Sequence, residues 1–231
     1  MKKTIIAFIL IATIILTASV TSAYTVEEAR SIQLQADSLI AAVDENSLIL
    51  DAMENVIDTS VPLSIRESII ASADFSPAVG VAQDAIELEV NSTVQKVGEI
   101  NLKNGETANM YVAATVAEIK EDYGGSSLGG VGAVAYVYWI DNPGTENELV
   151  AAAGSWNNPN DRELSNRKVR YGVADPLLIA FIKASPYRYP TTNYAYYSAS
   201  GFIGLTLCCM TWVDIEDYGT LHAKVGSSIL T

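Results

Sequence analysis

The hydrophobic period of the chain changes near residue 86, and this change constrains the fold more than any other feature of the sequence. Before it, apolar residues recur at steps of three and four, as in an amphipathic helix. After it, Ile86, Leu88 and Val90 alternate with Glu87 and Glu89, as in a strand with one buried face. Short strand-like runs separated by turn residues then continue along the chain. The sequence therefore predicts an α+β fold, in which an N-terminal helical segment precedes an antiparallel β-rich domain, with a sandwich as the favoured architecture.

The stretch before this change is predicted to be helical. Thr25 and Glu28 have the spacing of a capping box, in which each side chain bonds the backbone N–H of the other residue. The apolar stripe that follows predicts one helix over residues 26–57, with a break near Asn46. A second capping-box pattern predicts a further helix that ends near Ala73.

The clearest local signal in the β-rich part is the Asn-Gly dipeptide at 104–105. Both residues tolerate a positive φ, which a two-residue hairpin turn requires at its two central positions. The dipeptide therefore predicts a tight hairpin between strands over about 94–102 and 107–119. This turn would place Lys103 directly opposite Glu106, where the two charges attract each other.

Further segments of the β-rich part also carry local signals. The apolar and aromatic run over 131–140 predicts a strand, and Asp175 followed by a proline predicts a short helix over 175–184. The only two cysteines, Cys208 and Cys209, are adjacent in a predicted strand. Neighbours in a strand point to opposite faces, so we expect both thiols to be buried and unbonded, and a vicinal or an intermolecular disulfide is the alternative.

The N-terminus has the three parts of a secretory signal peptide. Lys2 and Lys3 supply its positive charge, and the uncharged apolar stretch Ile5–Leu16 follows. Small residues before Ala23 fit the rule for signal peptidase, which predicts cleavage between Ala23 and Tyr24. We therefore expect a secreted or cell-surface protein that has no membrane segment after cleavage.

The chain is predicted to divide into a signal peptide over 1–23, an acidic helical segment over 24–76 and an antiparallel β domain over 77–231. Residues 24–90 hold 13 acidic and two basic residues, in a chain whose net charge is −13. This negative charge repels nucleic-acid phosphates, so we expect no nucleic-acid partner. The sequence leaves the oligomeric state open.

The most specific enzyme pattern is Gly-x-Ser-x-Gly at 125–129, the nucleophile-elbow motif of α/β-hydrolases. The order of residues would make Ser127 the nucleophile, His222 the base and Asp214 the residue that orients the base. A nucleophile elbow leads into a helix, however, whereas the residues after 130 have the pattern of a strand. We therefore expect a non-enzymatic protein without a cofactor, and a secreted serine hydrolase is an alternative.

A carboxylate-rich loop is the candidate metal site of the sequence. Asp141, Glu146 and Glu148 lie close together in the chain, and Ca²⁺ prefers oxygen ligands of this kind. Their spacing does not match an EF-hand loop, and Asp, Asn, Pro and Gly are also the common residues of turns. Calcium binding is therefore an alternative to a simple turn.

Tyrosines are concentrated in one stretch near the C-terminal end of the β domain. Tyrosine offers a large, rigid apolar surface with a polar tip, which suits recognition of sugars or proteins. The candidate ligand-binding residues are Tyr187, Arg188, Tyr189, Tyr194, Tyr196 and Tyr197.

These features favour an exported, non-enzymatic surface or secreted protein with a structural or adhesive role, whose partner is a protein or carbohydrate surface. An extracytoplasmic module that binds a sugar or a small molecule is an alternative, and a tyrosine-lined cavity would favour it over adhesion.

The first 57 residues also resemble type IV pilins and archaellins, because an apolar segment leads into a long helix ahead of a β-rich head. The resemblance implies a filament subunit that retains its N-terminal apolar segment. The sequence departs from the pattern of those families, since no Gly or Ala follows the lysines before the apolar run.

Overall fold

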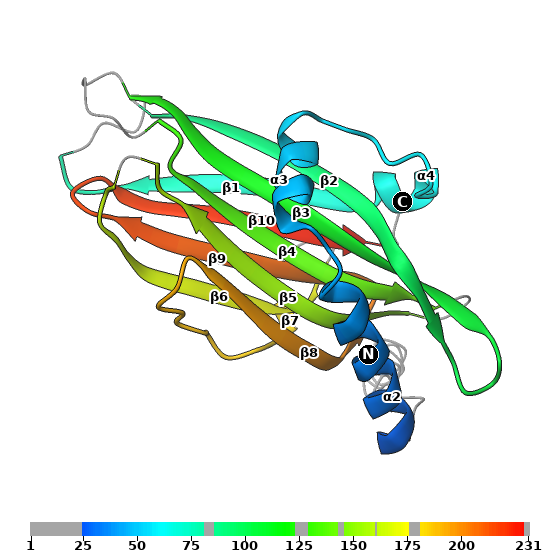
Figure 1. The fold of residues 1–231 in the computed structure, drawn as a ribbon. Helices are drawn as coiled ribbons and strands as arrows, with labels where there is room; N and C mark the ends of the chain where they lie inside the picture. The colour runs from blue at the N-terminus through cyan, green and yellow to red at the C-terminus, as the bar shows by residue number, and fades with distance from the viewer. Residues whose placement is uncertain are drawn as a thin grey trace, which may run out of the picture.

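Two five-stranded antiparallel sheets stack face to face, so the α+β fold with a sandwich is confirmed (Figure 1). The structure, a computed structural model, describes residues 25–80, 86–122, 129–142, 146–159, 161–175 and 181–228. The predicted signal peptide over 1–23 and its cleavage site before Tyr24 lie outside these residues. No helix in the described ranges combines the length and the apolar composition that crossing a membrane requires.

The two sheets are named here sheet A and sheet B. Sheet A contains, in spatial order, β1 (Ile69–Pro77), β10 (Gly219–Ser228), β9 (Thr206–Ile215), β6 (Leu164–Ala174) and β7 (Phe181–Ala184). Sheet B contains β2 (Ile86–Asn101), β3 (Thr107–Asp122), β4 (Gly132–Asp141), β5 (Asn147–Asn157) and β8 (Tyr194–Gly204). Among the described residues, three helices precede all of these strands: α2 (Val26–Ile40), α3 (Glu45–Met53) and α4 (Leu63–Glu67).

The main core lies between the two sheets, and alternation along the strands fills it. In β10, for example, Leu221, Ala223 and Val225 are buried in this core, whereas His222 and Lys224 point to the opposite face of sheet A. Burial of one such aliphatic side chain is worth about 1.5–3 kcal/mol, so this layer supplies much of the driving force for folding.

A second core lies between sheet B and the helices, which cross the outer face of that sheet (Figure 1). The apolar stripe of the helical segment supplies Ile32 and Ala36 from α2 and Leu48 from α3. They pack against side chains of β4 such as Tyr136 and Tyr138. Strand β4 is therefore buried on both faces, which explains its uninterrupted apolar sequence. The helical segment packs on the sandwich and does not form a separate stalk.

The N-terminal helix begins as the sequence predicted. Thr25 is the N-cap of α2, and it forms both bonds of the capping box with Glu28. The predicted helix over 26–57 is interrupted earlier than expected, however. Asp44 caps the start of α3 by accepting hydrogen bonds from two backbone N–H groups, so the chain turns at 41–44 and the second helix packs separately.

Two helix predictions are wrong in their C-terminal parts, where the structure has strands. The helix predicted to end near Ala73 ends at Glu67, and β1 follows, so the boundary predicted between 76 and 77 falls inside a strand of sheet A. The described part of the helix predicted over 175–184 is strand β7. Pairing with β10 and β6 supplies backbone hydrogen bonds that a local sequence pattern cannot reveal.

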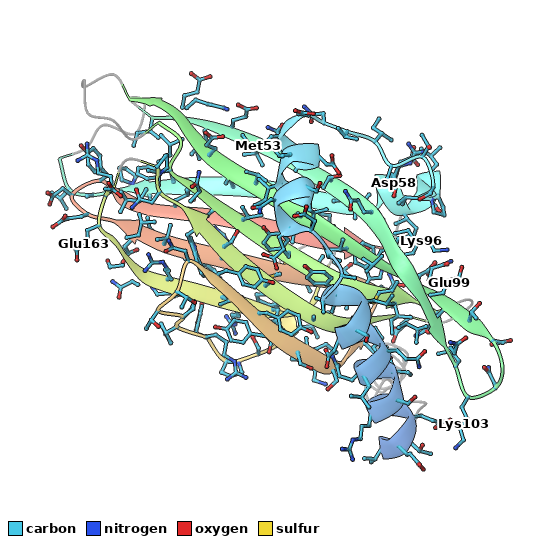
Figure 2. The ribbon with its side chains drawn as sticks, viewed as in Figure 1. Met53, Asp58, Lys96, Glu99, Lys103 and Glu163 are labelled. Atoms are coloured by element: carbon cyan, nitrogen blue, oxygen red, sulfur yellow. The ribbon has the colours of Figure 1, made fainter. Side chains whose placement is uncertain are left out.

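The hairpin between β2 and β3 also differs from the predicted tight turn. Leu102 N–H donates to the carbonyl of Glu106 at 2.9 Å, and Gly105 N–H donates to the carbonyl of Leu102 at 3.0 Å. Gly105 has a φ of +85°, which is typical of a three-residue loop with glycine in the left-handed position. Lys103 consequently does not face Glu106. Its Nζ lies 3.8 Å from Glu28 Oε1 of α2, beside the hairpin tip (Figure 2).

Candidate functional site

The outer face of sheet A carries a cluster of aromatic rings. The two longer helices both pack on sheet B, and these rings come from strands of sheet A and from the segment before β8. The cluster, called here the aromatic platform, consists of Trp212, His222, Tyr187 and Tyr189. Its residues come from β9, from β10 and from the segment that joins β7 to β8.

Strand register creates the centre of the platform. Trp212 of β9 lies directly opposite His222 of β10, and their rings stack with centroids 4.8 Å apart and planes 5° apart. Tyr187 meets the Trp212 ring edge-on at 5.7 Å, and the Tyr189 ring lies 6.4 Å beyond it. Tyr187 is 44% exposed and Tyr189 is 65% exposed. The platform is therefore a set of mutually supported rings with two accessible tyrosines.

Backbone hydrogen bonds hold the tyrosine segment beside sheet A. Arg188 N–H donates to the carbonyl of Val169 at 2.9 Å, and Val169 N–H donates to the carbonyl of Arg188 at 3.0 Å. Pro186 and Pro190 flank the tyrosines and restrict the backbone to an extended path. The two tyrosines are thus presented on a fixed segment, which lowers the entropy lost when a ligand binds.

Cationic side chains lie beside the platform and form no ion pair with a carboxylate among the described residues. The Arg170 guanidinium lies 4.8 Å from the centroid of the Tyr187 ring, and Lys168 is opposite Trp212 in the sheet register. Within the described residues, neither side chain forms an ion pair with a carboxylate. Lys224 is 4% exposed, and its Nζ also lacks a hydrogen-bond partner there. Asp74 lies opposite His222 on the same face, so the face carries both signs of charge, with the cations next to Tyr187 and Trp212.

His222 and Asp214, the two described candidates for a catalytic triad, have different surroundings. Burial lowers its pKa, and nearby Lys224 lowers the pKa further, whereas Asp74 partly opposes both effects. The carboxylate of Asp214 accepts hydrogen bonds from Thr220 Oγ1 at 2.6 Å and from Asn166 Nδ2 at 2.8 Å.

The third member of the predicted hydrolase triad, Ser127, lies outside the described residues. The two described members, Asp214 and His222, have separate environments. The structure therefore shows no contact between them that would support the serine-hydrolase alternative.

The six residues predicted for ligand binding occupy three different places. Tyr187, Arg188 and Tyr189 lie in the segment beside sheet A, as described above. Tyr194 and Tyr196 belong to the helix side of sheet B, where the Tyr196 hydroxyl donates to Asp37 Oδ1 at 2.9 Å.

Tyr197 instead packs against the core between the sheets. Its ring stacks on Tyr171 with centroids 6.2 Å apart, and the Arg188 guanidinium lies 5.7 Å from its centroid. Because β8 is a strand, successive tyrosines alternate between its faces, and one recognition loop does not form.

The candidate calcium residues do not form a metal site among the described residues, where no group of three His, Cys, Asp or Glu side chains could hold an ion. Asp141 lies near Tyr111 on the inner side of sheet B. Glu148 lies opposite Ile140, which belongs to the outer core. Glu146 follows residues 143–145, which the structure does not describe. Burial raises the pKa of Glu148 to about 7.

Sequence reasoning missed Trp212 and Arg170. Both lie at alternating positions of strands, so a hydrophobicity pattern assigns them a face but not a neighbour. The register that places Trp212 beside His222 and Arg170 beside Tyr187 joins distant parts of the chain, and no local signal specifies it.

Known proteins do not suggest a role for this surface. Comparisons with protein-family models, with curated proteins and with solved structures find no match to the chain. The fold and the site must therefore be interpreted from their own geometry: a sandwich with a fixed aromatic surface bordered by cations.

Proposed function

We propose that the protein is an exported, non-enzymatic recognition protein whose aromatic platform binds an acidic carbohydrate. The observation that carries this proposal is the combination of stacked, accessible rings with cations that have no carboxylate partner among the described residues. Export rests on the signal-peptide pattern of the first 23 residues.

The rings favour a sugar because a pyranose has an apolar C–H face and a polar rim. Tyrosine and tryptophan match both parts, since they offer an apolar ring surface with a hydrogen-bonding group at its edge. Tyr187 and Tyr189 are accessible for such stacking, and Trp212 supports Tyr187 from below.

The cations favour an acidic sugar over a neutral one. A guanidinium binds a carboxylate through two parallel hydrogen bonds, and such charge-assisted bonds are about twice as strong as neutral ones. Arg170 is held beside Tyr187, with Nη1 3.4 Å from the Tyr187 hydroxyl, so it lies next to the sugar-stacking surface. The two features together would place a uronic acid ring on tyrosine with its carboxylate toward Arg170.

Isothermal titration calorimetry of the chain without residues 1–23 tests this proposal, with a galacturonic acid trisaccharide and its neutral galactose counterpart as ligands. We expect the acidic trisaccharide to bind and the neutral one to bind more weakly. Tyr189→Ala should weaken binding by about three- to tenfold, through loss of ring contact. Arg170→Gln should weaken it by about tenfold or more, through loss of a charged hydrogen bond.

Lys96→Gln is the matched control, because Lys96 is a partly exposed cation of β2 in the other sheet. It should leave the affinity unchanged. Equal affinities for the two trisaccharides would refute the acidic specificity, and full binding by both platform variants would place the ligand elsewhere.

A further inference from the structure

A groove lies on the opposite side of the molecule from the platform, between α3 and the outer face of sheet B. Its volume is about 520 Å³. Small-molecule sites in proteins range from about 300 to 1,000 Å³, so the groove has room for a small organic ligand. It is separate from the proposed sugar site, because the two lie on the outer faces of different sheets.

Aromatic side chains line the groove from the sheet side. Tyr136 and Tyr194 meet edge to face with ring centroids 6.4 Å apart, and Tyr136 is fully buried whereas Tyr194 is half-buried. The Tyr136 hydroxyl and Ser155 Oγ are 3.2 Å apart, which fixes the orientation of that ring. These residues come from three adjacent strands, β4, β5 and β8, and therefore form a rigid surface.

Helix α3 forms the other wall and leaves apolar side chains exposed there. Leu50 is 55% exposed and Met53 is 36% exposed, although both belong to the apolar pattern of the helix. Figure 2 shows Met53 at the end of α3, above sheet B. An apolar ligand in the groove would cover these side chains together with the aromatic rings.

The charged groups of the groove lining are both acidic. Glu45, at the start of α3, lies close to the Tyr194 hydroxyl and forms a hydrogen bond with it. The side chain of Glu118, on β3, is 19% exposed. Lys120 forms an ion pair with Glu118 at 3.3 Å, but Lys120 does not line the groove and also pairs with Glu89 at 2.7 Å.

Burial raises the pKa of both Glu45 and Glu118, because partial removal of water disfavours the charged carboxylate. A positive charge bound in the groove would offset this penalty. Aromatic rings also attract cations through the negative charge of their faces, so the two kinds of lining favour the same ligand.

We propose that this groove binds an organic ammonium ion that carries an apolar group. The ammonium lies between the Glu45 carboxylate and the ring of Tyr194, and the apolar group lies against the exposed side chains of Leu50 and Met53 on α3. Anionic ligands are disfavoured because both charged residues of the lining are acids.

Calorimetric titration with phenethyl-trimethylammonium tests the proposal, and 2-phenylethanol serves as the uncharged counterpart. We expect the ammonium to bind, with the alcohol at least about tenfold weaker, because the alcohol lacks the charge that the carboxylates attract. Glu45→Gln should weaken ammonium binding by about tenfold without affecting the alcohol. Leu50→Ala should weaken both ligands by about threefold, through lost apolar contact.

Glu54→Gln is the matched control, since Glu54 follows α3 directly but is not part of the groove lining. It should keep the affinity of the unmodified chain. Equal binding of the ammonium and the alcohol would overturn the proposal, as would an absence of ammonium binding. If Glu45→Gln and Glu54→Gln weaken ammonium binding equally, the acidic surface as a whole attracts the ligand, and the proposed site in the groove is refuted.

Discussion

Replacement of Tyr138 by phenylalanine is expected to stabilise the protein. Tyr138 is fully buried in the core between sheet B and the helices, and its hydroxyl has no hydrogen-bond partner among the described residues. A buried hydroxyl without a partner costs about 1–3 kcal/mol relative to its hydrated state in the unfolded chain. Tyr138→Phe removes this cost and keeps the ring, so the free energy of unfolding should rise.

Tyr136 provides the matched control on the same face of the same strand. Its hydroxyl is also buried, but it lies 3.2 Å from Ser155 Oγ and forms a hydrogen bond with it. Loss of such a bond costs about 0.5–1.5 kcal/mol, so Tyr136→Phe should destabilise the protein. The two substitutions delete the same atom and are predicted to have effects of opposite sign.

Urea unfolding followed by circular dichroism measures both effects. With a slope of about 2–3 kcal/mol per molar urea, a gain of about 1 kcal/mol raises the midpoint by about 0.3–0.5 M. Tyr138→Phe should raise the midpoint, and Tyr136→Phe should lower it. If Tyr138→Phe lowers the midpoint as much as Tyr136→Phe does, the Tyr138 hydroxyl has a partner, such as a bound water, and the reasoning is refuted.

Three further predictions concern the interior. Gly154→Ala should destabilise the protein by about 1–3 kcal/mol, because the new methyl would overpack the core between the sheets. The methyl carbon would lie 2.7 Å from Thr211 Cγ2. The urea midpoint measures this loss of stability. Burial raises the pKa of Glu148 to about 7 in the folded protein, so folding favours the protonated carboxyl. The stability that this protonation supplies is fully present below the unfolded pKa of about 4.5 and is lost as pH rises through 7. Glu148→Gln should therefore remove up to about 3 kcal/mol of pH dependence between pH 4.5 and 8, measured by urea unfolding across that range. Burial raises the pKa of Cys208 to about 12, so its thiol should react with Ellman's reagent far more slowly in the native protein than in urea.

Each of these predictions has an internal control. Thr211→Ser removes the methyl that the new side chain in Gly154→Ala would strike, so the double variant should recover part of the lost stability. A double variant no more stable than Gly154→Ala would place the strain elsewhere. Glu146→Gln should keep the pH dependence that Glu148→Gln removes. Fast reaction of the native thiols would contradict their burial.

Features of the fold were predictable from the sequence where they depend only on residues a few positions apart in the chain. Thr25 and Glu28 predicted the start of α2, because a capping box involves residues only three positions apart. Alternation in β10 puts His222 and Lys224 on the face opposite Leu221, and such an assignment needs only the local sequence, since side-chain direction follows from the pleat alone.

Features that depend on distant pairing were not predictable. Residues 69–73 were expected to be helical, but β1 forms because β10 supplies its partner strand. The aromatic platform required the register of β9 with β10, and the groove required β8 to lie next to β5. Tyr194 and Tyr197 point to opposite faces because they lie three positions apart in one strand, but which core each face meets depends on this pairing.

The pairing of β1 with β10 also determines when the sandwich can assemble. Ser68, just before β1, bonds Ser227 in β10 across a separation of 159 residues. During synthesis, β1 emerges before the other described strands and its partner β10 emerges after them, so sheet A remains incomplete until all of these strands are available. Such long-range pairing slows folding, because the entropy of closing the loop is lost before the contacts are gained. Sheet B, whose first four strands pair in sequence order, can form earlier and serve as the surface on which sheet A is completed.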